Sequence, residues 1–121
     1  MKKTMGMTVT VLFLLWTSPV FCDIPDQTTI QDISFIARCD STEQRYVLVF
    51  PRVFASDKPH DVLIALHGHG SDRWQFVRDG RDECRAARDF AAKHDMLYVS
   101  PDYRAKTSWM GPKAEADVAQ I

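Results

Sequence analysis

The sequence predicts an α/β fold in which an antiparallel hairpin leads into parallel strands with helices. Two segments rich in β-forming residues, 33–38 and 44–50, flank turn residues at 40–42, an arrangement typical of a hairpin. Residues 62–66 are continuously apolar, as expected for a strand buried on both faces of a sheet. A helical pattern and a second apolar strand at 96–99 follow, in the strand–helix–strand order of a parallel sheet.

The hairpin segments alternate as strands do. In the second one, one face carries Tyr46, Leu48 and Phe50 and the other carries Val47 and Val49, before a proline ends the strand. We therefore expect two paired strands ahead of the parallel part of the sheet.

The predicted helix between the parallel strands begins near Asp79, a plausible N-cap with an acidic residue three positions later. Its apolar positions recur at helical spacing: Cys84, Ala87, Phe90 and Ala91. Another helix is expected from Lys113 to Ile121. No third parallel strand follows it, so the sequence predicts a sheet that is incomplete at the C-terminus, in which one edge of strand 96–99 is left unpaired.

Residues 1–22 have the features of a secretory signal peptide. Lys2 and Lys3 precede an apolar stretch at 9–16, which is too short to span a bilayer. Cleavage is expected after Cys22, which predicts a secreted or periplasmic protein with no membrane attachment. Acylation of that cysteine would require a small residue before it, and Phe21 is not small. Residues 23–43 would form the mature N-terminus and first strand, and residues 44–121 the partial α/β domain.

Composition limits the function classes. The chain has 121 residues, 45% of them hydrophobic and 26% charged, with a net charge of −1, which excludes a disordered or multispan protein. The basic residues are dispersed, so no nucleic-acid partner is expected. After cleavage two thiols remain, Cys39 and Cys84, and the sequence leaves their pairing open.

The segment from Asp61 to Gly70 ends in His67-Gly68-His69-Gly70, directly after the apolar strand. This segment resembles the oxyanion-loop signature of the α/β-hydrolase superfamily. Two further stretches, 45–51 and 90–104, are similar to the neighbouring strands and helix of secreted esterases. The resemblance is to the polyhydroxyalkanoate depolymerase, feruloyl esterase and prolyl oligopeptidase-like groups. It implies the N-terminal part of an α/β-hydrolase sheet.

By this resemblance, the His67–Gly70 loop would stabilise the oxyanion formed during acyl transfer. The donor would be the backbone N–H of His69 or that of Gly68, and His67 would hold the loop in place. Trp74 and Asp102 are possible substrate-side residues. Packing is the alternative role for Trp74, and fixing a loop by hydrogen bonds is the alternative for Asp102.

The catalytic triad of that superfamily has no counterpart in the sequence. Its members follow the oxyanion loop, and no Gly-x-Ser-x-Gly occurs among the 121 residues. Ser71 belongs to the loop itself. We therefore expect the front part of a secreted serine hydrolase that cleaves carboxylic esters without a cofactor, and we expect this chain to be inactive alone.

Three alternative functions are also compatible with the sequence. A serine peptidase of prolyl oligopeptidase type would act on a peptide instead of a small ester. A zinc-dependent hydrolase would use His67 and His69 as ligands, but the sequence offers few further ligands near them. A non-catalytic secreted small module would use the same length for binding alone.

Overall fold

The computed structural model describes residues 28–104 and 109–121, so the predicted signal peptide at 1–22 and its cleavage site lie outside the described residues. The elements follow in the order β1 (Ile30–Ile36), β2 (Glu43–Val49), β3 (Val62–Ile64), α1 (Gln75–Arg78), α2 (Asp82–Lys93), β4 (Leu97–Pro101) and α3 (Pro112–Gln120). Within the described ranges, no helix is long and apolar enough to cross a membrane.

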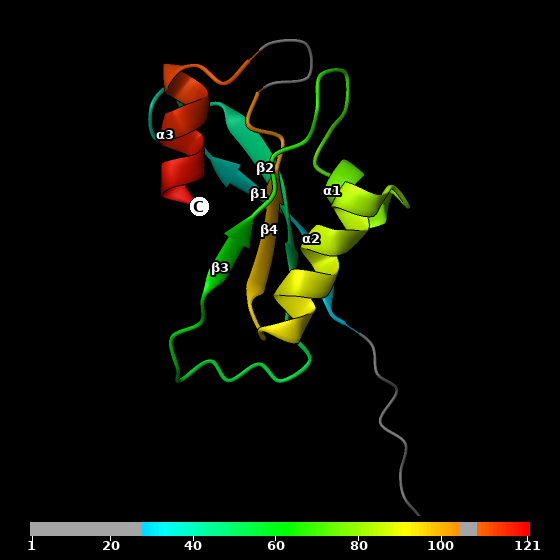
Figure 1. Cartoon of the computed structure of the whole chain (residues 1–121). Helices are drawn as coiled ribbons and strands as arrows, with labels where there is room; N and C mark the ends of the chain where they lie inside the picture. Colours follow the sequence, from blue (N-terminus) through cyan, green and yellow to red (C-terminus); the bar gives the residue numbers. More distant parts are fainter. Residues whose placement is uncertain (1–27, 105–108) are drawn as a thin grey trace, which may run out of the picture.

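The four strands form one mixed sheet in the order β1-β2-β4-β3. β1 pairs with β2 and β2 with β4 in antiparallel fashion, whereas β3 and β4 run parallel. Figure 1 shows α2 and α3 on opposite sides of this sheet. The predicted fold class, a hairpin leading into parallel strands with helices, is confirmed.

The hairpin forms because its alternating side chains match in register. Ile33 pairs with Tyr46 and Phe35 with Gln44, which places the Phe35 and Tyr46 rings edge to face, 5.9 Å apart. The turn between the strands contains Ser41 at φ 59°, a left-handed conformation. The prediction of two paired strands is therefore confirmed, although both strands begin and end slightly earlier in the chain than expected.

The prediction that one edge of strand 96–99 is unpaired was wrong. β4 lies between β2 and β3 and bonds to both, so it is an interior strand. After the crossover through α1 and α2, the chain pairs with the edge of β3 that faces β2. Local sequence patterns do not specify on which edge of β3 the next strand pairs. Among the described strands, β3 instead has a single neighbour.

The prediction that strand 62–66 is buried on both faces was also wrong. Leu63 and Ala65 face the side covered by α2 and contribute to the core. The alternate side chains Val62, Ile64 and Leu66 are 48%, 44% and 39% exposed. Of the described elements, none covers this face of β3 well enough to bury it.

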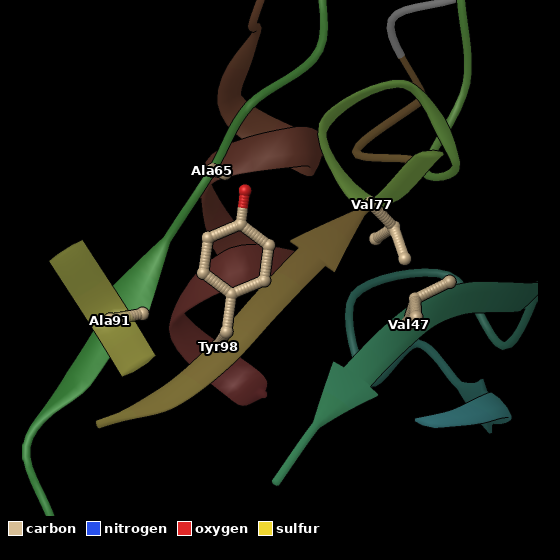
Figure 2. Packing of buried hydrophobic residues seen from close by; sticks show 5 residues of the cluster. All are labelled: Val47, Ala65, Val77, Ala91 and Tyr98. Carbon is tan, nitrogen blue, oxygen red and sulfur yellow. The ribbon is translucent and has the colours of Figure 1, made fainter. Parts of the chain in front are cut away.

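The core lies between the sheet and the helices α1 and α2. Figure 2 shows its central cluster, which consists of Val47, Ala65, Val77, Ala91 and Tyr98. Tyr98 is 2% exposed, and its hydroxyl donates to the carbonyl of Phe76 over 3.3 Å. Burial raises the pKa of Tyr98 to about 12.

The N-terminus of α2 differs from the prediction. Arg81, not Asp79, is the N-cap residue. The Asp79 carboxylate accepts the Arg81 backbone N–H at 3.0 Å and its Nε at 2.8 Å, which is an Asx turn before the helix. Asp82 and Glu83 occupy the first turn, where a negative charge interacts favourably with the helix dipole.

Both described cysteines are free thiols. Cys39 is exposed and Cys84 is buried on α2. Burial also raises the pKa of the Cys84 thiol, so this side chain behaves as a small apolar core residue.

Candidate functional site

The loop after β3 begins at His67, which is 3% exposed. Its Nδ1 lies 2.9 Å from the Gly68 carbonyl oxygen and its Nε2 lies 3.1 Å from the Asp102 carbonyl oxygen, so either nitrogen donates when it carries the proton. Tyr103 packs on the ring at 4.6 Å and donates its hydroxyl to the His67 carbonyl at 2.5 Å. His67 thus ties the loop to the segment after β4.

Residues 68–71 form a type II β-turn. The Ser71 N–H donates to the Gly68 carbonyl at 3.1 Å, and Gly70 occupies the third position with φ 79°. His69, at the second position, is not among the residues with positive φ. A type II turn requires positive φ at its third position, where glycine carries no steric cost. This requirement explains Gly70.

The two candidate oxyanion donors differ. The Gly68 N–H donates to Oε1 of Gln75 at 2.7 Å and is therefore engaged. The His69 N–H has no partner in any part of the chain that the structure describes, and His69 is exposed. Both residues are exposed, so the two amides differ in that the Gly68 N–H is hydrogen-bonded and the His69 N–H is not bonded within the described chain.

Arg73 fixes the far side of the loop. Its Nε and Nη2 bind the two carboxylate oxygens of Asp32 on β1, each at 2.8 Å. Its Nη1 and its backbone N–H bind the two oxygens of Asp102, each at 2.9 Å. These hydrogen bonds lower the pKa of Asp32 and raise that of Arg73. The loop is thereby attached to two strands of the sheet.

The predicted substrate-side residues occupy different environments. Both carboxylate oxygens of Asp102 accept from Arg73, which favours the loop-fixing alternative. Trp74 is half-buried against the core, with the Arg78 guanidinium 3.7 Å from its ring centroid. These contacts favour a packing role for Trp74.

A polar cavity of about 340 Å³ lies beside the loop. Its lining comes from β2, the loop and the segment after β4: Gln44, His67, Ser71, Asp72, Arg73, Asp102 and Arg104. Arg73 and Arg104 are both paired with carboxylates, whereas the Asp72 carboxylate accepts the Trp74 backbone N–H and has no cation partner among the described residues.

Arg104, which also lines this cavity, forms a second charged cluster. It donates to Asp40 in the β1–β2 turn at 2.6 and 3.0 Å and to the 3%-exposed carboxylate of Asp117 on α3. Lys113 also binds Asp40, at 3.0 Å. Hydrogen bonding to Arg104 is the main reason that the pKa of Asp40 is lowered. The cluster joins the hairpin, the end of β4 and α3.

The zinc alternative finds no ligand set. Within residues 28–104 and 109–121, no three His, Cys, Asp or Glu side chains are grouped so that they could hold a metal ion. Both ring nitrogens of His67 lie within hydrogen-bond distance of backbone carbonyl oxygens, so neither is directed at a possible metal site. His69 therefore has no partner ligand in this part of the chain.

Sequence reasoning missed Gln75 and Asp32. The side chain of each reaches the loop through a single partner residue, and Asp32 lies 41 positions from its partner Arg73. A lone glutamine or aspartate carries no local spacing signal, so only the fold reveals these contacts.

No family model and no curated protein sequence matches the chain. Solved structures do resemble it. A ferulic acid esterase from Anaeromyces mucronatus aligns with a TM-score of 0.51 and 20% identity over 72% of this chain and 35% of that one. An S-formylglutathione hydrolase from Staphylococcus aureus aligns with a TM-score of 0.53 and 21% identity, over 78% and 42%.

Both structures are α/β-hydrolase-fold enzymes. The chain has part of the α/β-hydrolase fold. It spans between about a third and two fifths of the length of these structures. In this α/β-hydrolase sheet, the His67–Gly70 loop follows β3 at the carboxyl edge, the edge at which ligands of parallel sheets bind.

Proposed function

We propose that this chain carries the oxyanion loop of a secreted serine hydrolase that cleaves carboxylic esters through an acyl-enzyme. The observation that carries the proposal is the His69 N–H, which has no partner among the described residues and lies in a β-turn closed by the Ser71–Gly68 hydrogen bond. Acyl transfer develops negative charge on a carbonyl oxygen, and a fixed amide donor stabilises that charge at no reorganisation cost.

The surrounding contacts support this role. His67 and Arg73 attach the loop to the sheet on two sides and so restrain the turn that carries the His69 amide, and His67 and Ser71 of the same loop line the polar cavity. The fold supports it as well, because the neighbouring structures are esterases and hydrolases. The nucleophile of the proposed enzyme is not among these 121 residues, which contain no Gly-x-Ser-x-Gly.

The first test is the DNA beyond the codon for Ile121. We expect the same or a shifted reading frame to encode Gly-x-Ser-x-Gly within a few tens of residues. Absence of such a sequence in every frame would remove the main support for a serine hydrolase.

The second test uses the complete reading frame and a short-chain chromogenic ester. His69→Pro removes the proposed donor while keeping the turn, because proline is favoured at the second position of a type II turn. We expect kcat to fall by about 10²–10³ with little change in KM. His69→Ala, which keeps the N–H, is the matched control and should retain activity. Equal activity of the two variants would refute the donor assignment.

A further inference from the structure

We infer that Gln75 is the positioning residue of the oxyanion loop, because it engages the Gly68 amide and so leaves the His69 amide as the donor. The inference rests on the proposed function. It adds a residue from outside the His-Gly-x-Gly motif, and this residue selects which of two adjacent amides faces the substrate.

The hydrogen bond between Gln75 and Gly68 is short, and the backbone around Gln75 is held in place. Oε1 of Gln75 lies 2.7 Å from the Gly68 nitrogen, which is short for an amide–carbonyl hydrogen bond. Gln75 is the first residue of α1, and its own N–H donates to the Asp72 carbonyl at 3.0 Å. Val77, two residues later, is buried in the core. The backbone that carries the glutamine is therefore fixed on both sides.

The consequence for the loop follows from hydrogen-bond counting. A backbone amide has one proton, so the Gly68 N–H that donates to Gln75 is not available to an oxyanion. The same bond restrains the first residue of the type II turn, whose carbonyl accepts from Ser71. His69 follows directly and keeps its N–H unengaged within the described chain. Without the Gln75 acceptor, the Gly68 amide would also be free to bind solvent or substrate and would compete with the His69 amide.

The space around Gly68 agrees with this role. A Cβ at that position would meet only the end of the Gln75 side chain, at 3.6 and 3.8 Å. The glutamine amide is thus the group that closes over the Gly68 backbone.

The test measures single amides in the 121-residue chain and needs no catalysis. Hydrogen–deuterium exchange is read at Gly68 and His69 by mass spectrometry with residue-level fragmentation, which tolerates self-associated samples. Gln75→Leu removes the acceptor, and Gln75→Glu keeps it. Gln120→Leu is the matched control, because Gln120 also bonds to backbone, at Arg38 and Ile36, but far from the loop. Gln75→Asn, which withdraws the acceptor by one methylene, replaces the leucine variant if that one does not fold.

We expect Gln75→Leu and Gln75→Asn to speed exchange at Gly68 about tenfold, the equivalent of one lost hydrogen bond. Exchange at His69 should already be fast in every variant. Gln75→Glu and Gln120→Leu should leave Gly68 protected. Unchanged Gly68 exchange in the leucine variant, or loss of protection in the glutamate variant, would overturn the inference.

In the complete reading frame, the prediction is kinetic. Gln75→Leu should lower kcat about tenfold with KM unchanged, and Gln75→Glu should restore it, a pattern that a general loss of stability does not produce. If no nucleophile is found downstream, the proposed function fails while the exchange measurement still decides the role of Gln75. If the enzyme is active but the leucine variant matches the wild type, only the present inference fails.

Discussion

The guanidinium of Arg73 binds the carboxylate of Asp32 through two parallel bonds of 2.8 Å, although the two residues lie 41 positions apart. This pair attaches the loop that follows β3 to β1, the strand at the opposite edge of the sheet. Arg73 also binds Asp102, which follows β4, so a single side chain links β1 to the segment after β4. The position of the proposed oxyanion loop therefore depends on contacts that lie outside its own motif.

Replacing Arg73 should destabilise the fold. The Arg73 side chain is 14% exposed, and its loss leaves the partly buried Asp102 carboxylate without its cation and Asp32 with Arg45 alone, at 3.2 Å. We expect Arg73→Leu to lower the free energy of unfolding by about 2 kcal/mol in urea denaturation. Arg73→Lys should recover only part of this, because an ammonium cannot form the bidentate contact.

Arg85→Leu is the control for this prediction. Its pair with Asp82 is formed by side chains that are 62% and 92% exposed, so we expect a change below about 0.5 kcal/mol. Equal effects of the two leucine variants would show that Arg73 contributes no more than a surface pair.

The lowered pKa values of Asp32 and Asp40 predict acid sensitivity. Hydrogen bonds from Arg73 and Arg104 favour the ionised carboxylates in the folded state, so the unfolded state binds protons first as the pH falls. The stabilisation is complete above the ordinary value of 3.8 and is lost progressively below it. Unfolding measured between neutral and acid pH should show this decline.

The double variant Asp32→Asn, Asp40→Asn tests the assignment. It should be less stable than the wild type at neutral pH and should lose less stability on acidification. A decline of the same steepness in the double variant would assign the acid sensitivity to other groups.

The raised pKa of Tyr98 predicts a loss of stability at alkaline pH. Burial favours the neutral phenol, with a folded pKa of about 12 against an ordinary value of 10.0. Stability is therefore intact below pH 10 and falls as the pH rises through the folded value, by about 1.4 kcal/mol per unit between them. Tyr98→Phe should flatten this alkaline decline in denaturant titrations. At neutral pH the variant should lose only about 1 kcal/mol, for the bond to the Phe76 carbonyl.

The sequence predicted those parts of the fold that depend on local patterns. The alternation of apolar and polar residues predicted β1 and β2. The apolar residues 62–66 and the glycines that follow them predicted β3 and its loop. The order of β4 and β3 in the sheet was not predictable in this way, because it depends on where the crossover returns. The same holds for Gln75, whose contact with Gly68 becomes visible only when α1 is placed against the loop.

Ser100 gives a prediction of gained stability. It is fully buried on β4, and its Oγ has no hydrogen-bond partner among the described residues. A buried hydroxyl without a partner carries an uncompensated desolvation cost. We expect Ser100→Ala to leave stability unchanged or to raise it by about 1 kcal/mol in thermal or urea unfolding. A loss above this size would reveal a bond to the hydroxyl that the described residues do not supply.

The exposed face of β3 predicts self-association of the 121-residue chain. Val62 and Ile64 on β3, together with Leu66 just after it, are three exposed large apolar side chains, and β3 has one neighbour among the described strands. An apolar strand with an unpaired edge readily pairs with another chain, and a lysine on such a strand prevents this. Ile64→Lys should therefore shift sedimentation profiles towards the monomer. Since Ile64 is 44% exposed, the substitution removes little core contact and should leave the unfolding midpoint nearly unchanged.

Val53→Lys separates the strand edge from simple surface hydrophobicity. Val53 is 73% exposed, more than Ile64, but it lies in the loop between β2 and β3 and offers no free strand edge. If association depends on β3, Val53→Lys should sediment like the wild type while Ile64→Lys does not. If both lysines suppress association equally, apolar exposure in general is the cause. If neither does, association involves a different surface and the β3 edge is not the contact.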